Sequence, residues 1–172
     1  MSNMAPRTGL GLAAALATLL AGSATACRPS TEAAPAGESG AATCPDTFVE
    51  EPRPTPGRTG QLVPEGADAA LLCVYPFQPD ERTGVYRLGK VVADVKRPAQ
   101  VVEHLNALAD VDRTAMSACS LMAHDQYQVI LGYPANTHTI ARIDYNCGTA
   151  SSAGAVRALG RVGDLLAFWP DR

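Results

Sequence analysis

The stretch from Cys119 to Cys147 limits the fold of this chain more than any other part of it. Two runs within it, Gln126–Tyr133 and Thr139–Tyr145, alternate at every second position between aromatic or branched residues and mostly more polar ones. This pattern is typical of a β-strand with one face in water. Between the runs, Pro134–Thr137 contains Pro and Asn, which favour a tight turn. The sequence therefore predicts a β-hairpin with a cysteine near each end.

Residues 1–26 have the marks of an export signal. Arg7 supplies positive charge, Leu10–Ala21 is an uncharged apolar run, and Ala24–Ala26 fits the small-residue cleavage pattern. The apolar run is shorter than the roughly 20 residues that a bilayer-spanning helix needs, which disfavours a retained anchor helix. We therefore expect residues 1–26 to be a signal peptide.

Cys27 follows the cleavage pattern directly, and this segment resembles a bacterial lipoprotein signal, in which such a cysteine is lipidated on sulfur and becomes the amino terminus. That pattern usually has Leu three residues before the cysteine, where this chain has Ala24. Ordinary signal-peptidase cleavage after Ala26 also fits the sequence. Residues 27–43 have no large apolar residue and are predicted to form a disordered tether, which a lipid anchor needs.

Cysteine number also favours lipidation, because removing Cys27 from five cysteines leaves four that can all pair. We expect a lipoprotein whose acylated Cys27 inserts into the lipid bilayer at the outer face of the cell membrane. The alternative is a soluble secreted protein. Loss of Arg7 with the signal changes the formal net charge from −3 to −4, and the chain has no block of like charges. Nucleic acid and anionic lipid surfaces are therefore poor partners.

Residues 44–172 are long enough to form one domain with a single core. Leu71–Phe77 is predicted to be a short buried strand, Val85–Val95 its antiparallel partner, and Gln78–Gly84 the exposed loop between them. Pro98 then opens a helix at its first turn, where a missing N–H does no harm. The apolar stripe of this helix consists of Val101, Val102, Leu105, Leu108 and Ala109.

Beyond Cys147, the small residues of Gly148–Gly154 predict a loop with room for one short strand. Apolar residues from Ala158 to Trp169 recur at three- and four-residue spacing, which predicts a second helix ended by Pro170. The order strand, strand, helix, strand, strand, helix predicts an α+β fold. We expect an antiparallel sheet of about four to five strands with two helices packed on one face.

A set of short motifs behind the signal and tether resembles a group of small exported actinobacterial lipoproteins with two disulfides. These motifs are Cys44-Pro45, Leu62-Val63-Pro64, Leu72-Cys73-Val74-Tyr75, Cys119 and Cys147. The resemblance covers most of residues 44–172. It implies an exported location and disulfide bonds, and it brings no catalytic residue with it.

Four cysteines remain in residues 44–172, and pairing neighbours in the cysteine order gives Cys44–Cys73 and Cys119–Cys147. Each bridge closes a loop of about 30 residues, which contributes roughly 3–4 kcal/mol in the chain-entropy model. The other two connectivities are also allowed by the sequence. Disulfides fit an exported protein, and pairing is therefore favoured over a nucleophilic role for Cys119 beside His124 and Asp125.

The sequence shows no clear motif for a metal site or for a hydrolase active site. The histidines His104, His124 and His138 lack the spacing of a helical zinc site, and only a spatial group of His124, Asp125 and His138 remains conceivable. Ser151 lies in a predicted loop without a nearby base, and Asp110 is predicted to cap or solvate the turn after the first helix. We therefore expect no metal and no cofactor.

These observations favour a non-enzymatic extracytoplasmic module that binds an unknown protein or envelope ligand. Connections on a rigid scaffold most often carry binding. The candidate contacts are therefore the exposed turn Tyr133–His138 and the loop Gln78–Gly84, with side chains Tyr133, Asn136, His138, Asp80 and Arg82. The alternative is a secreted protein that acts as a hydrolase inhibitor or as a small envelope hydrolase.

Overall fold

The structure is a computed structural model that describes residues 38–49, 60–78, 84–93, 95, 97–111 and 124–170. All of them belong to one compact unit, Glu32–Arg172, and none to the unit Met1–Thr31. The described residues form nine strands and two helices, so the mixed α+β class is confirmed. None of the helices in these ranges is long and apolar enough to cross a membrane.

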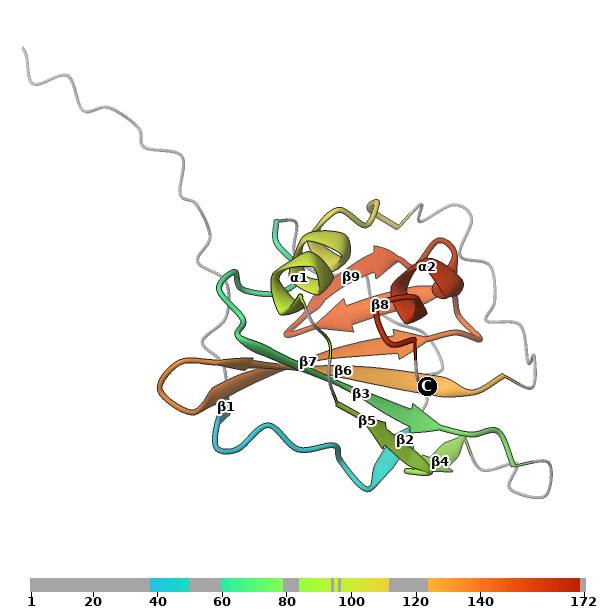
Figure 1. The fold of residues 1–172 in the computed structure, drawn as a ribbon. Coiled ribbons are helices and arrows are strands. Elements are labelled where there is room, and N and C mark those ends of the chain that lie inside the picture. Colours follow the sequence, from blue (N-terminus) through green and yellow to red (C-terminus); the bar gives the residue numbers. More distant parts are fainter. Residues whose placement is uncertain are drawn as a thin grey trace, which may run out of the picture. The chain divides into compact units, whose positions relative to one another are not determined.

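Seven strands form the main sheet, in which every pairing is antiparallel (Figure 1). This sheet is larger than the four to five strands that the sequence predicts. Its path is β5 (Lys90–Val92), β3 (Ala69–Tyr75), β6 (Gln126–Tyr133), β7 (Thr137–Asp144), β8 (Thr149–Ser152) and β9 (Ala155–Ala158), and β1 (Glu38–Ser39) also pairs with β7.

A second sheet of two strands, β2 (Thr47–Val49) and β4 (Val85–Arg87), packs on the main sheet. The prediction of one strand over Val85–Val95 is therefore wrong, because only Lys90–Val92 pairs with β3. The ladder between β3 and β5 ends at Val74, two residues before Pro76, which has no N–H for further pairing.

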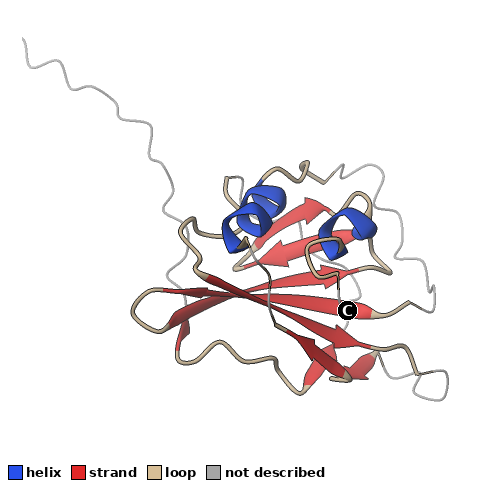
Figure 2. Ribbon diagram, viewed as in Figure 1, coloured by secondary structure: helices blue, strands red, loops and turns tan. Residues whose placement is uncertain are grey.

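Alternation along the central strands, which are drawn in red in Figure 2, separates the buried side chains into two hydrophobic clusters. Leu72 and Val129 lie opposite each other and belong to the larger cluster, which also contains buried residues of both helices, α1 (Pro98–Asn106) and α2 (Val162–Leu166). On the other face of the sheet, Cys73 and Ile130 pack against Phe48 of β2. The core therefore has a layer on each side of the main sheet.

The predicted wet face of the hairpin is buried, because β2 and its neighbours cover it. Gln126 and Gln128 are 0% and 4% exposed. The Tyr75 hydroxyl lies 2.9 Å from the Gln128 amide group and 2.9 Å from the Pro45 carbonyl oxygen. These polar side chains are tolerated inside the fold because they have hydrogen-bond partners there.

The predicted loop over Gly148–Gly154 and the predicted helix from Ala158 to Trp169 are wrong in part. Gly148–Gly154 is largely strand β8 and its turn, and Ala158 belongs to β9 rather than to a helix. Gly160 has a φ of 66°, a left-handed conformation that interrupts a right-handed helix. Helix α2 consequently begins only at Val162, and Trp169 follows it as a fully buried side chain that is 1% exposed.

Residues 38–43 of the predicted tether, 27–43, belong to the described fold. Ser39 and Glu38 pair with Thr137 and His138, and the Gly40 N–H donates to the Asn136 carbonyl oxygen at 2.9 Å. Hydrogen bonds between backbones need no apolar side chain, which explains how a segment without large apolar residues becomes ordered. The described part of the chain thus starts inside the segment that was expected to be disordered.

Candidate functional site

Gln78, the first residue of one predicted contact loop, and the other predicted loop, Tyr133–His138, lie at opposite ends of the central strands. β3 and β6 pair from Ala69 opposite Gly132 to Tyr75 opposite Gln126. Gln78 therefore lies beyond the end of the sheet that is remote from the β6–β7 turn. We call one end the turn end (Glu38–Gly40, Pro64–Asp68 and Tyr133–His138). We call the other the Tyr145 end (Phe77, Gln78, Tyr86, His124, Asp125, Gln126, Tyr145 and Asn146).

Within the β6–β7 hairpin at the turn end, Pro134, Ala135 and Asn136 are exposed. The Tyr133 hydroxyl donates to the Pro64 carbonyl oxygen at 2.8 Å. Burial raises the pKa of Tyr133 to about 12. The half-buried Tyr133 side chain thus fastens the hairpin to the segment before β3.

His138 also has an internal contact at the turn end. Its ring atom Nδ1 lies 3.2 Å from the Gly40 carbonyl oxygen, and β1 pairs with the same stretch of β7. Of the three predicted turn contacts, only Asn136 is an exposed side chain. The described chain therefore enters the fold beside the β6–β7 turn.

At the Tyr145 end, the buried Gln126 side chain connects the start of β6 to the end of β7. Its Oε1 accepts the Tyr145 N–H at 2.8 Å, and its Nε2 donates to the His124 carbonyl oxygen at 3.4 Å. A buried amide that lost these partners would be destabilising, so the two contacts hold this end of the hairpin in one arrangement.

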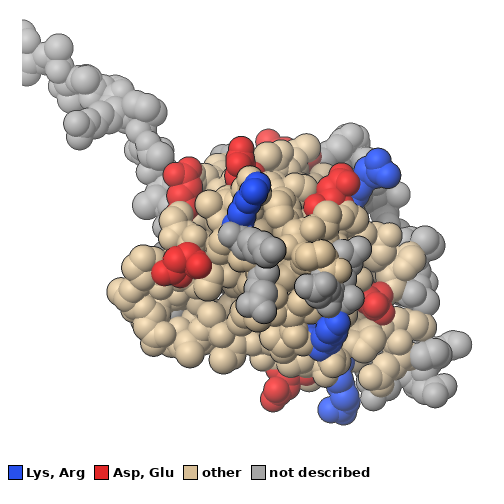
Figure 3. Space-filling view, in the orientation of Figure 1, with Lys and Arg blue, Asp and Glu red and all other residues tan. Residues whose placement is uncertain are grey.

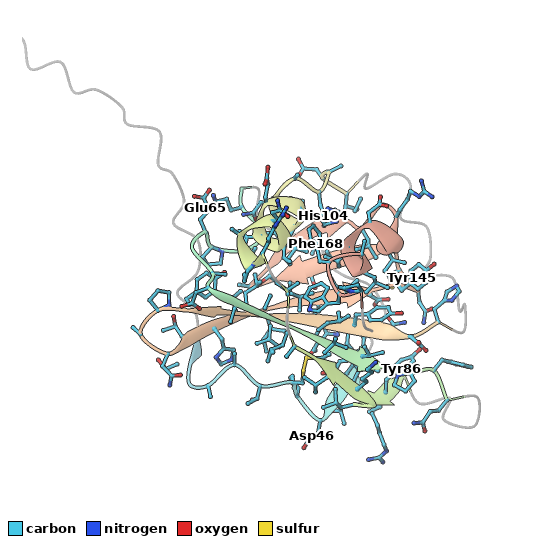
Figure 4. All side chains as sticks on the ribbon, viewed as in Figure 1. Asp46, Glu65, Tyr86, His104, Tyr145 and Phe168 are labelled. Atoms are coloured by element: carbon cyan, nitrogen blue, oxygen red, sulfur yellow. A yellow bond between two sulfur atoms is a disulfide. The ribbon has the colours of Figure 1, made fainter. Side chains whose placement is uncertain are left out.

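Half-buried rings lie around this Gln126 network. The His124 and Tyr145 rings stack with centroids 4.4 Å apart. Asn146 Nδ2 donates to the Tyr86 hydroxyl at 3.2 Å, so the small sheet is joined to the same end. Tyr86 and Tyr145 are labelled in Figure 4. Asp125 Oδ1 accepts the Phe77 N–H at 2.9 Å and fixes the start of the loop that leaves β3.

The Cys44–Cys73 disulfide is present, with 5.7 Å between the two Cα atoms. This pairing excludes the two alternative connectivities of the four domain cysteines. Cys147 is disulfide-bonded as well. Its expected partner, Cys119, lies outside the described residues, so the second pairing stays a prediction.

The histidines do not converge. His124 precedes β6 at the Tyr145 end, while His138 pairs with Gly132 near the turn, and the conceivable metal site of His124, Asp125 and His138 is therefore wrong. His104 packs against Phe168, with ring centroids 5.6 Å apart. Within the described ranges, no three His, Cys, Asp or Glu side chains form a group that could hold a metal ion.

The remaining residues that the sequence analysis considered either have a structural role or lie outside the described residues. Asp110 faces the buried Arg157 at 3.4 Å, with its own side chain 77% exposed. Ser151 lies on β8 rather than in a loop. Cys27, Asp80 and Arg82 lie outside the described residues.

Sequence reasoning missed Gln126 and the ring pair of His124 and Tyr145. The available signal was a pair of glutamines, Gln126 and Gln128, on one face of a strand that carries no charged residue. Comparison of the chain with protein-family models, with curated proteins and with solved structures finds no match. We therefore base a functional proposal on the chain's own residues.

Proposed function

We propose that this chain is an exported lipoprotein, anchored through acylated Cys27 to the outer face of the cell membrane, that binds a protein of the envelope without catalysing a reaction. The export signal, the tether and the disulfide Cys44–Cys73 support this location. The lipoprotein resemblance of the motifs around Cys44 and Cys73 supports it as well.

The observation that most supports a binding role is the set of aromatic rings held in place at the Tyr145 end. Tyr145, His124 and Tyr86 are half-buried rings. Tyr145 and His124 are held by the contact between their rings, and Tyr86 is held by the hydrogen bond from Asn146. Aromatic side chains are enriched at protein interfaces, and rings fixed in advance lose little freedom when a partner binds.

The scaffold behind this end supports the same role. We infer that both helices pack on one face of the main sheet, since Val101, Leu105 and Leu165 share a cluster with Val129. On the face drawn in Figure 3, acidic and basic side chains are interspersed. A mixed surface of this kind suits a protein partner better than a polyanion.

A photoreactive amino acid at Gln78 tests the proposal in living cells of the source organism. Gln78 is exposed beside the Tyr145 end, and Gln100, which is also exposed but lies on α1, provides the matched control. We expect illumination to give one protein adduct from Gln78, and the same adduct from a photoreactive residue at His124. Equal adducts from Gln100, or none from either Tyr145-end position, would contradict a binding role for this end.

A further inference from the structure

The two outermost strands of the main sheet, β9 and β5, differ in what covers their outer edges. At β9 the edge is closed, because the Ala158 N–H donates to the Ala109 carbonyl oxygen at 2.9 Å. Asp110 also forms an antiparallel bridge with Arg157 of the same strand. At the other end of the path, β5 pairs with β3 and with no other strand of the described residues (Figure 1). An edge of this kind is a template on which another chain can add a strand.

The side chains of β5 differ between the two faces of the sheet. Val91 lies opposite Cys73, and therefore on the face of the smaller hydrophobic cluster. It is 48% exposed, and Val49 is the only other exposed large apolar side chain among the described residues. Lys90 lies opposite Val74, on the face of the larger cluster, and is exposed as well. A strand added at β5 would therefore meet a valine on one face and a positive charge on the other.

The chain that follows β5 leaves Val91 uncovered. Val92 is 8% exposed and Val95 packs against the larger cluster, so both lie on the face opposite Val91. Successive side chains of a strand point to opposite faces of a sheet. A segment that pairs with β5 consequently needs alternating residue types, with apolar side chains toward Val91 and acidic side chains toward Lys90.

We propose that the β5 edge binds an extended segment of a protein partner in which apolar and acidic residues alternate. Hydrogen bonds with the backbone of β5 hold such a segment, and its alternate side chains provide the specificity. Its apolar residues pack beside Val91, and its acidic residues lie beside Lys90. This inference goes beyond the proposed function, since it depends neither on the Tyr145 end nor on acylation of Cys27.

Charge distinguishes this partner from a second copy of the chain. Lysine on an edge strand is a common guard against pairing between identical edges. Two copies joined through an antiparallel pair of β5 strands would bring two Lys90 side chains to the same face of one short edge. Like charges so close across a strand pair are unfavourable, whereas an acidic residue in the same place is attracted. The exposed lysine therefore disfavours self-association and favours an acidic partner.

Two synthetic peptides of about eight residues test the proposal, one alternating valine with glutamate and the other alternating valine with lysine. Each is titrated into the isotope-labelled, exported Cys27→Ser chain, which cannot be acylated at that position, and the amide signals are followed by NMR. We expect the valine–glutamate peptide to bind about fivefold more tightly than the valine–lysine peptide. The largest shifts should be those of Lys90, Val91 and Val92.

Three variants at exposed positions make the test specific to the β5 edge. Lys90→Glu should reverse the preference between the two peptides. Val91→Asp should weaken binding of the valine–glutamate peptide by about fivefold, while Val49→Asp, a matched change on β2, should leave it unchanged. No binding, an unchanged preference in Lys90→Glu, or an equal loss in Val49→Asp would overturn the inference. A dimer of the chain without peptide that shifts the β5 signals would also overturn it, because the occupant would then be a second copy.

Discussion

The guanidinium carbon of Arg142 lies 4.6 Å from the centre of the Phe48 ring. Arg142 belongs to β7 of the main sheet and Phe48 to β2 of the small sheet, and Arg142 Nη2 also donates to the Val49 carbonyl oxygen. The Phe48 ring in turn contacts Tyr75 and Tyr86, at centroid distances of 5.7 Å and 6.1 Å. One side chain therefore joins the two sheets through a ring contact and a hydrogen bond.

We predict that Arg142→Met lowers the free energy of unfolding by about 2 kcal/mol, because it removes a partly desolvated cation–π contact and a charged hydrogen bond. Methionine keeps most of the apolar stem, so the loss reports the guanidinium group. Urea denaturation followed by circular dichroism measures it. Arg161→Met is the control at an exposed position and should change stability by less than about 0.5 kcal/mol. Equal effects of both variants would show that Arg142 does not join the sheets.

Removal of the Cys44–Cys73 disulfide should cost about 3–4 kcal/mol in the double variant Cys44→Ala, Cys73→Ala, since the bridge closes a loop with a sequence separation of 29. Urea denaturation without reductant measures the loss. The same samples allow non-reduced peptide mapping, in which we expect a Cys119–Cys147 peptide in both proteins. A change in stability below about 1 kcal/mol would contradict this role for the bridge.

Ala135 has a φ of 63°, a conformation that a side chain makes unfavourable. We predict that Ala135→Gly raises the free energy of unfolding by roughly 0.5 kcal/mol, because relief of this strain exceeds the added entropy of the unfolded chain. Ala69→Gly, at an exposed position of β3, should instead destabilise by about 0.5–1 kcal/mol. Thermal unfolding of both variants tests the difference in sign.

Alkaline pH should destabilise the fold through its buried tyrosines. Burial raises the pKa of Tyr75 to about 12, with Arg142 lowering it and Asp46 raising it by smaller amounts. The unfolded phenol loses its proton near pH 10, so the folded chain binds more protons than the unfolded chain between pH 10 and 12. Stability is therefore complete below pH 10 and falls as the pH rises toward 12.

Tyr75→Phe and Tyr133→Phe provide the comparison, because each variant removes one phenol whose pKa is about 12. We expect each to lose less stability than the wild-type chain between pH 10 and 12, as measured by urea denaturation at a series of pH values. Parallel pH profiles for all three proteins would show that these phenols do not control alkaline unfolding.

The sequence predicts β6 at its observed bounds, Gln126–Tyr133, because its alternating pattern is local and uninterrupted. It also places the start of α1 at Pro98, since a helix accepts proline in its first turn. Both elements follow from preferences that each residue carries within its own segment.

The remaining elements depend on contacts between distant segments. β8 consists of Thr, Ala and Ser, and pairing with β7 and β9 makes it a strand despite its weak pattern. Likewise, β1 and β2 contain two and three residues, too few to show any period. The Tyr145 end depends on His124 meeting Tyr145, and this contact exists only after the hairpin has formed.

Mass spectrometry of the amino-terminal peptide, from the membrane fraction of cells that express the full chain, tests the central claim most directly. We predict a mature protein that begins at Cys27 and carries the mass of a lipid group, and a Cys27→Ser variant that moves to the medium. A mature amino terminus at unmodified Cys27, or wild-type protein found only in the medium, would contradict the proposed anchor and the role built on it.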